Sequence, residues 1–333
     1  MTMFRVAVFG WLLAASAWGG EDALQGLEAP KGAKVRKFAF TYEAIVKEVP
    51  AGTKKLEVWL PVPQNNAHQV ITNLKFVPEP HKLESDKVGN SFAYWRFKEA
   101  EAKPQSVILT FDCERHEIAA ADLAKGRALN PRECSSLKEY LEPDHLVPVG
   151  SEFQSITTEA IGKAEAPHEI AKSAYNYVYS SMAYGKPEGK AWGRGDTWYA
   201  CKEGVGNCTD FHALFMSIGR TAGIPVKFEM GFPLPEPEKG KEGKIGGYHC
   251  WAKFYLGDIG WVPVDISEAW KHRELVSYYY GNLTADRVQF TTGRDIELKP
   301  GFDGKKPLFF IYPLAEADDK ELKMDKSFSF KDL

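Results

Sequence analysis

The sequence is short of cysteine, of net charge and, after its first twenty residues, of long apolar runs. Five cysteines in 333 residues exclude a small disulfide-dense scaffold. A formal net charge of −3 gives no electrostatic reason to expect nucleic acid as a partner. The later apolar stretches are too short to cross a bilayer, so we expect a protein that does not span the membrane. Apolar and aromatic residues are plentiful, at 44% and 13%, and the length suggests about two domains.

The first nineteen residues have the pattern of a secretory signal peptide. Arg5 is the only charged residue before Glu21, and an apolar run over residues 6–18 follows it. Small residues at positions 15–17 and 17–19 fit a cleavage site near Ala17 to Gly19. The run is shorter than the ~20 residues that a membrane anchor needs. We therefore predict a signal peptide over residues 1–19 and a secreted or periplasmic protein in which disulfides persist.

Residues 35–118 carry the pattern of a β-sandwich. Phe38, Phe40 and Tyr42 alternate with polar residues, and further short alternating runs follow, separated by turn residues. Such a series predicts an antiparallel sandwich. Residues 119–150 are interrupted by three prolines and are expected to form a connector.

Helical spacing begins in residues 151–333, which we predict to be the catalytic domain with a C-terminal strand extension. Ala171, Ala174, Tyr175 and Val178 lie on one face of a helix. A second helix is expected over about 208–222, followed by strands at 226–232, 248–256 and 261–266. The polar, Gly/Pro-rich residues 233–247 are expected to form a mobile flap. The predicted fold class is α+β: a sandwich followed by a helix packed on an antiparallel sheet.

Cys208 is the candidate nucleophile. It follows Gly204-Val-Gly-Asn207 and stands at the start of the second helix. A helix N-terminus has unpaired N–H groups and a partial positive charge, which favour a thiolate and can receive an oxyanion. A buried structural cysteine is the alternative interpretation of this motif alone.

His249 and Asp265 are the candidate base and its orienting group, because they lie in consecutive strands joined by a short loop. If Tyr255 pairs with Trp261, the two side chains are diagonal neighbours on one face. If Leu256 pairs with Trp261, they point to opposite faces. The sequence leaves both registers open.

Four sequence blocks follow one another along the chain: Gly204-Val-Gly-Asn-Cys208, Arg220-Thr-Ala-Gly-Ile-Pro225, His249-Cys-Trp251 and Gly260-Trp-Val-Pro-Val-Asp265. In this order they resemble the transglutaminase-like superfamily of cysteine enzymes. The resemblance is close over about residues 156–266. The resemblance implies a papain-like Cys208–His249–Asp265 triad without a metal or other cofactor, on a core that often follows a β-domain. It also implies an upstream side chain at the oxyanion, for which Trp198 and Tyr199 are candidates.

The predicted reaction is acyl transfer from a peptide or protein carboxamide, with cell-wall peptide as one candidate substrate. The thioester on the cysteine is then resolved by water or by an amine, and the triad does not distinguish the two outcomes. Trp192, Trp251 and Trp270 are candidates for the substrate site.

Two alternatives compete with this hypothesis. One is a zinc site built from Cys208, His212, His249 and Cys250. The other is a secreted, non-catalytic module for binding or assembly.

The odd number of cysteines fits a free nucleophile. If Cys208 stays a thiol, the other four can pair in three ways. We favour Cys113 with Cys134 and Cys201 with Cys250, because Cys250 should face away from the His249 side of its strand.

Overall fold

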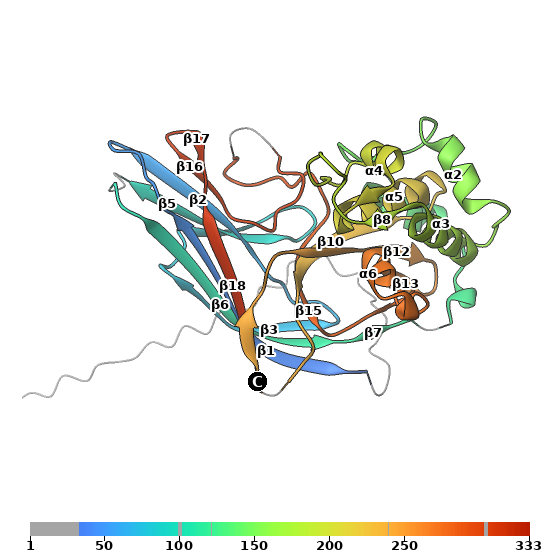
Figure 1. Ribbon diagram of the computed structural model, residues 1–333, viewed down its shortest axis with the longest axis horizontal. Helices are drawn as coiled ribbons and strands as arrows, with labels where there is room; N and C mark the ends of the chain where they lie inside the picture. The colour runs from blue at the N-terminus through green and yellow to red at the C-terminus, as the bar shows by residue number, and fades with distance from the viewer. Residues whose placement is uncertain (1–32, 99–101, 121, 239, 303–305) are drawn as a thin grey trace, which may run out of the picture.

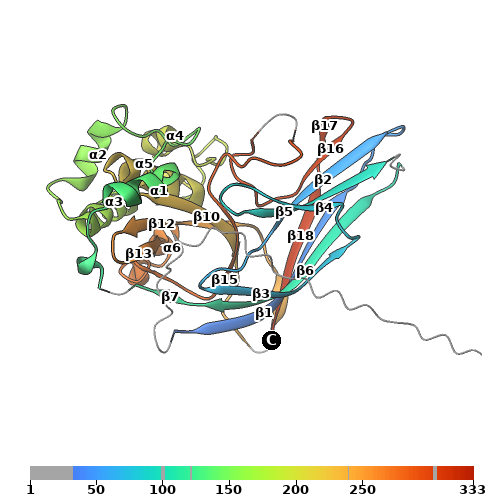
Figure 2. The same ribbon diagram turned by 180° about the vertical axis from the view of Figure 1, so that it is seen from behind.

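The computed structural model describes residues 33–98, 102–120, 122–238, 240–302 and 306–333, and the predicted signal peptide lies outside them. An all-β lobe lies beside a lobe in which helices pack on a sheet (Figure 1, Figure 2). The α+β class and the order of its parts are confirmed. In the part of the chain that the structure describes, no helix is long and apolar enough to cross a membrane.

Two five-stranded sheets face each other in the all-β lobe. One has the order β11 (Glu242–Lys244), β18 (Asp325–Asp332), β1 (Val35–Val46), β6 (Gln105–His116) and β3 (Gln69–Val77). The other has the order β17 (Lys320–Leu322), β16 (Leu314–Ala317), β2 (Lys55–Val62), β5 (Ser91–Lys98) and β4 (Lys82–Ser85). Alternation in β1 buries Phe38, Phe40 and Tyr42 on one face of its sheet, as the period-2 pattern predicts.

The sandwich extends beyond residues 35–118, which corrects the predicted boundaries. β18 at the C-terminus pairs with β1, with Phe330 opposite Phe40. The expected flap carries β11, which pairs with β18, and Ile245 donates to the carbonyl of Phe328 at 2.9 Å. The edge of β1 needs a partner for its backbone groups, and β18 supplies one with matching alternation. The C-terminal strands therefore complete the sandwich and do not extend the helix-containing lobe.

The second lobe is built on a four-stranded sheet with the order β13 (Gly260–Val264), β12 (His249–Leu256), β10 (Val226–Pro233) and β15 (Arg287–Thr292). The central helix α5 (Cys208–Thr221) is buried along nearly its whole length. The remaining helices are α1 (Pro131–Ser136), α2 (Gln154–Ile161), α3 (Pro167–Ser181), α4 (Thr197–Glu203) and α6 (Ile266–Lys271), with 3-10 turns η1 (Leu123–Lys125), η2 (Lys138–Tyr140) and η3 (Arg273–Leu275). Two short strand pairs are β7 (Ile118–Ala119) with β14 (Asn282–Leu283) and β8 (Ala183–Tyr184) with β9 (Val205–Gly206).

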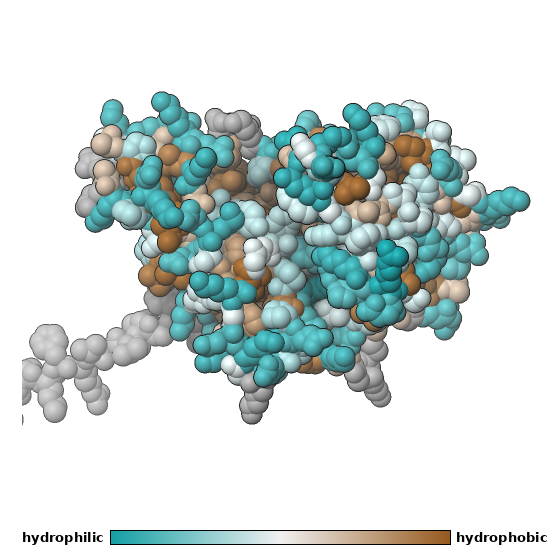
Figure 3. Space-filling model, in the orientation of Figure 1, coloured by the Kyte–Doolittle hydropathy of each residue, from teal (hydrophilic) through white to brown (hydrophobic). Residues whose placement is uncertain are grey.

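The two lobes share one apolar core. At their junction Phe40 of β1 packs on Phe232 of β10 at 5.5 Å, and Phe232 packs on Phe290 of β15 at 5.2 Å, measured between ring centroids. Buried residues of both lobes form a continuous cluster through these contacts. The outer surface on one side is mostly hydrophilic, with apolar residues in small scattered groups (Figure 3). The sheet that carries the candidate base is thus braced from behind by the sandwich.

Candidate active site

Cys208 is the first residue of α5, and Asn207 caps this helix. The N–H of Thr209 donates to Asn207 Oδ1 at 2.8 Å, and the N–H of Asn207 donates to Asp210 Oδ2 at 2.9 Å. These two bonds form a capping box that fixes the first turn. The side chain of Cys208 is buried at this turn. The predicted placement of the cysteine at a helix N-terminus is therefore what the structure shows.

The backbone N–H of Cys208 is the best placed oxyanion donor. The N–H groups of Thr209, Asp210 and Phe211 all donate to Asn207. Among the hydrogen bonds of the described residues, none is donated by the N–H of Cys208. This donor lies on the nucleophile itself and points out of the helix N-terminus.

Trp198 and Tyr199, the oxyanion candidates of the sequence, have other partners. The ring of Trp198 on α4 packs on Phe153 at 5.3 Å, and the Tyr199 hydroxyl donates to the carbonyl of Ala191 at 3.0 Å. No contact in the described structure brings either side chain to Cys208.

His249 and Asp265 meet because the hairpin adopts the first of the two registers. Tyr255 is opposite Trp261, and His249 Nε2 lies 2.8 Å from Asp265 Oδ2. The strand ends at Val264, and Asp265 caps helix α6 by accepting from the N–H of Glu268 at 3.2 Å. The expected strand over 261–266 is therefore shorter, because Asp265 serves as a helix cap.

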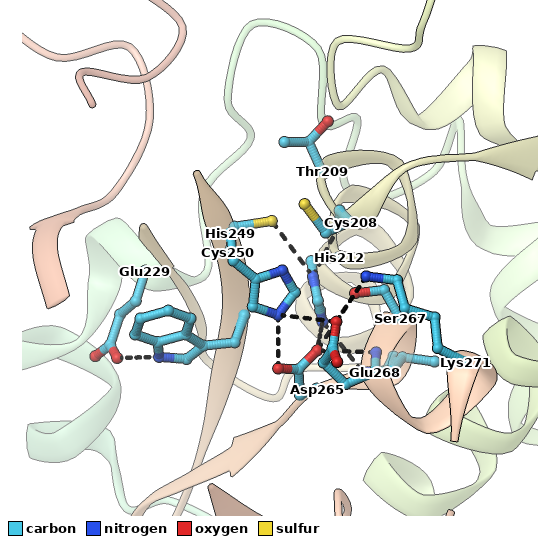
Figure 4. A network of polar contacts seen from close by, with 12 residues as sticks. Cys208, Thr209, His212, Glu229, His249, Cys250, Asp265, Ser267, Glu268 and Lys271 are labelled. Atoms are coloured by element: carbon cyan, nitrogen blue, oxygen red, sulfur yellow. Dashed lines mark hydrogen bonds and ion pairs between the residues drawn. The ribbon is translucent and has the colours of Figure 1, made fainter. Parts of the chain in front are cut away.

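Cys208 lies on the other side of the imidazole, on α5 opposite β12 (Figure 4). A hydrogen bond links the Cys208 sulfur to His249, whose Nε2 is already engaged by Asp265. The nitrogen that faces the sulfur is therefore Nδ1. The structure brings the three predicted residues together in the order thiol, imidazole, carboxylate.

Buried charge around Asp265 sets the ionisation of the triad. Burial alone would raise the pKa of Asp265, but the charges of His249 and Arg287 hold it below its ordinary value. Arg287 Nη1 donates to Asp265 Oδ2 at 2.8 Å. Burial alone would lower the pKa of His249, but Asp265 and then Cys208 raise it to about 10. His249 is thus an imidazolium at neutral pH.

The thiol of Cys250 contributes to the acidity of Cys208. A hydrogen bond from Cys250 lowers the pKa of Cys208 well below its ordinary value, against the effect of burial, and His249 lowers it further. Burial and the neighbouring Cys208 raise the pKa of Cys250 well above its ordinary value. The site therefore favours a Cys208 thiolate beside a protonated Cys250.

The favoured disulfides are not formed. All five cysteines are free thiols. Cys250 interacts with Cys208, as His249 does, and its sulfur lies 3.6 Å from His212 Nδ1. Cys201 is exposed on α4, whereas Cys250 is fully buried. Cys113 is likewise buried in β6, and Cys134 lies partly exposed on α1.

His212 is a structural residue, which argues against the zinc alternative. Its Nδ1 lies 2.7 Å from the carbonyl of Cys208, and its Nε2 accepts from the N–H of Ile266 at 3.2 Å. Burial lowers the pKa of His212 to about 4, so the ring is neutral and both nitrogens are engaged. In the described residues, the one group of three side chains with potential ligand atoms within 4.8 Å is acidic and lies in the sandwich, at Glu57, Glu316 and Asp319.

The three tryptophans proposed for substrate binding lie in different environments. Trp192 is half exposed, and its ring lies 6.4 Å from Tyr184. Trp270 is partly buried on α6 beneath the Arg273 guanidinium. Trp251 is fully buried and donates its indole N–H to Glu229 at 2.6 Å, so it cannot line a substrate site. It supports the ring of His249 from behind, at 6.2 Å between centroids.

Three residues near the triad were missed from the sequence. Tyr184 lies in range of the Cys208 charge, which together with burial raises the pKa of its hydroxyl. The Lys271 ammonium lies 4.1 Å from the Tyr184 ring and 2.7 Å from Glu268 Oε1. Arg287 comes from β15 and pairs with Asp265. None lies in a short motif with the cysteine or histidine, so the spacing gave no signal for them.

Comparisons with known proteins give a matching family model, a related sequence and a solved structure with a similar fold. Residues 154–266 match the family model described as the transglutaminase-like superfamily. An uncharacterized protein of Haemophilus influenzae is 27% identical over 342 residues, covering 88% of this chain and 90% of the relative. A solved structure from Cytophaga hutchinsonii, provisionally named a cysteine protease, aligns with a TM-score of 0.60 at 15% identity. It covers 89% of this chain and 90% of that protein, so the shared fold includes both lobes.

The matched region begins in α2 and ends just after Asp265, and it contains all three triad residues. The chain therefore carries a transglutaminase-like core domain at residues 154–266, placed against an antiparallel β-sandwich.

Proposed function

We propose that the protein is a cysteine-dependent enzyme that transfers the acyl group of an amide or peptide bond through a thioester on Cys208. One observation carries this proposal: the Cys208 sulfur at the N-terminus of α5 is hydrogen-bonded to His249, whose Nε2 lies 2.8 Å from Asp265. A base, its orienting carboxylate and a nucleophile in contact are the minimum set for such a reaction.

In the first half-reaction the Cys208 thiolate attacks the substrate carbonyl, and the carbonyl oxygen becomes an oxyanion. The N–H of Cys208 donates to this oxygen as the negative charge develops. The His249 imidazolium gives its Nδ1 proton to the leaving nitrogen, so that the C–N bond breaks and a neutral amine departs. Asp265 holds the ring through Nε2 and stabilises its positive charge.

In the second half-reaction neutral His249 takes a proton from water or from an amine, which attacks the thioester carbonyl. The C–S bond breaks, the product acid or new amide leaves, and the Cys208 thiolate returns beside the imidazolium. Both nucleophiles use the same triad. The acceptor that reaches the thioester therefore decides between hydrolysis and transfer.

Peptide or protein carboxamides are the substrates that the surroundings of Cys208 suit. Tyr184 and Tyr248 lie in range of the Cys208 charge, and the Trp192 ring lies 6.4 Å from that of Tyr184. Such rings provide apolar contact for an extended chain. The solved structure from Cytophaga hutchinsonii is itself provisionally named a cysteine protease. Secretion or export to the periplasm is part of the proposal, based on the pattern of residues 1–19.

Mass spectrometry of peptide mixtures tests the proposal. The protein is incubated with glutamine-containing peptides, with and without a primary amine. Cleavage indicates a peptidase, an amide-to-acid mass change indicates a deamidase, and an amine adduct indicates a transferase. The Cys208→Ala variant is the control and should show none of these. A wild-type protein equal to this control, beside an active reference enzyme, would contradict the proposal.

A further inference from the structure

A second polar site lies at the junction of the two lobes, on the far side of Trp251 from the triad. The Trp251 indole N–H donates to Glu229, and its ring faces His249. Beside Glu229 lies a cavity of about 140 Å³, whose polar lining includes Asn66, His68, Lys227, Glu229, Lys253 and Gln289.

Two lysines and one carboxylate form the floor of this cavity. Lys227 of β10 is directly opposite Lys253 of β12, and both are only 7% exposed. Each ammonium approaches the same atom, Glu229 Oε1, at 3.3 Å and 3.1 Å. The other oxygen of Glu229 accepts from Trp251. Like charges directly opposite on paired strands repel each other, and a single carboxylate oxygen is shared between them.

A third cation lies near this floor, outside the lining of the cavity. Arg115 of β6 is fully buried, and none of its three guanidinium nitrogens has a hydrogen-bond partner among the described residues. Its charge acts on Lys253 and on His68, and burial together with these cations keeps His68 neutral, with a pKa of about 3. Arg115, Lys227 and Lys253 thus face one carboxylate, Glu229. Burying charge without compensation costs several kcal/mol, and an anion at this point would offset that cost.

We propose that the junction cavity is a binding site for a ligand that carries a carboxylate group. The two ammonium groups present six N–H donors to one acceptor oxygen, and a carboxylate would supply two more oxygens. Around the cavity, the Asn66 amide donates to Gln289 Oε1 at 3.0 Å and the Gln289 amide donates to Thr292 at 3.1 Å, which leaves each amide nitrogen one further N–H. Tyr140 packs edge-on against Trp261 at 4.9 Å. The charged floor, the amide sides and the aromatic rim suit a small organic acid or the C-terminal carboxylate of a short peptide.

Isothermal titration calorimetry tests this site. The titrations use the protein without the predicted signal peptide, at constant ionic strength in a chloride buffer. The probes are N-acetylalanine, an N-acetylated tripeptide with a free C-terminus, N-acetylalanine amide and inorganic phosphate. We expect N-acetylalanine or the tripeptide to bind and the amide to bind at least about tenfold more weakly. Tighter binding of N-acetylalanine would indicate a small organic acid as the ligand, and tighter binding of the tripeptide would indicate the C-terminus of a peptide.

Three substitutions locate the binding. Lys253→Met should weaken carboxylate binding by about tenfold or more, and Lys227→Met repeats the test if the first variant does not fold. Glu229→Gln removes the competing charge and should tighten binding. Lys47→Met, at an exposed lysine on the sandwich, should leave it unchanged.

Equal binding of acid and amide, binding of phosphate alone, no heat at millimolar probe, or full affinity in folded Lys253→Met would each overturn the assignment. These readouts need no catalysis, so they stand apart from the proposed activity.

Discussion

The carboxylate of Asp265 is fully occupied by its neighbours. It accepts from His249, from Arg287 at 2.8 Å, from Ser267 at 3.3 Å and from the N–H of Glu268 at 3.2 Å. A carboxylate with this many donors is held in one position and stays ionised. The imidazole of His249 is therefore fixed before any substrate arrives, and single substitutions around it should change its ionisation more than its position.

Cys250→Ala should raise the pKa of the Cys208 thiol, because the hydrogen bond from Cys250 is the largest influence lowering it. At mildly acidic pH the thiolate fraction would therefore fall. Iodoacetamide labelling of Cys208 would slow by about tenfold for each pH unit by which the pKa of Cys208 rises. Mass spectrometry of the Cys208 peptide across a pH series measures this. Cys201→Ala, at an exposed thiol, is the matched control and should label like wild type. Identical profiles for both variants would show that Cys250 has no such role.

The pH profile of amide cleavage should fall at alkaline pH. His249 must be protonated to release the amine, and its pKa is raised to about 10, so activity declines as pH rises toward that value. Asp265 is the main group that raises this pKa. In Asp265→Asn the decline should move to lower pH, with activity reduced roughly 10²–10⁴-fold. Initial rates from about pH 5 to about pH 10.5 with one peptide test this, and an unmoved alkaline limb in the variant would count against it.

The pKa shifts of His249 and Asp265 both stabilise the fold, but their contributions are lost in opposite pH directions. The raised pKa of His249 stabilises the fold below its ordinary value of about 6.5, and this contribution disappears as pH rises through about 10. The lowered pKa of Asp265 stabilises the fold above about 4, and this contribution is lost as the carboxylate is protonated in acid.

Sequence reasoning found the three residues that the structure brings together, but not the charged and aromatic groups around them. Cys208, His249 and Asp265 carry local signals, namely a glycine-rich turn before a helix and two adjacent strands. The register stayed open because a slip of one residue reverses every side chain, and no turn motif of known geometry fixed it. Arg287 and Tyr184 reach the site from distant segments, and their contacts follow from tertiary packing alone.

At the scale of elements, the contact between β10 and β15 positions the histidine strand. Gly231 of β10 is paired with His249 of β12 and lies at a register shift toward β15. A Cβ at this position would lie 1.8 Å from the carbonyl oxygen of Val288. Only glycine permits the two backbones to approach this closely. The geometry of the base thus depends on a residue that touches none of the reacting atoms.

Gly231→Ala should destabilise the protein by about 1–3 kcal/mol and displace the strand that carries His249. We expect a lower midpoint in urea unfolding and a loss of peptide cleavage larger than the unfolded fraction explains. Gly246→Ala is the control, because a Cβ there meets nothing within 4 Å. Wild-type activity in folded Gly231→Ala would refute the link between this contact and His249.

The strands themselves were largely predictable, and their partners were not. Alternation revealed β1, β2, β6, β10, β12 and β13 because each buries one face or a short apolar run. The pairings of β1 with β18 and of β11 with β18 join strands that are far apart in the sequence. Local pattern contains no information on such pairings, so the C-terminal strands were assigned to the wrong lobe.

At the scale of the whole molecule, we expect the two lobes to unfold as one cooperative unit, since their buried residues form a continuous core. Phe330 of β18 is 4% exposed and belongs to that core. Damage to the sandwich should therefore reach the triad, although the sandwich holds none of the reacting groups.

Phe330→Ala should lower the free energy of unfolding by about 3–5 kcal/mol through the cavity it leaves. Far-UV circular dichroism and exposure of Cys208 to alkylation should report the same reduced denaturant midpoint. Ser327→Ala, on an outward position of the same strand, should shift neither. A Cys208 transition that stays at the wild-type midpoint would mean that the lobes unfold separately.

The pairing of the first strand with the last has a consequence for synthesis. β1 begins at Val35, and the strand that covers its edge, β18, spans Asp325–Asp332. Until the ribosome has released β18, β1 lacks this neighbour and the sheet keeps an open edge. The sandwich that braces the histidine strand therefore cannot close before β18 has been made.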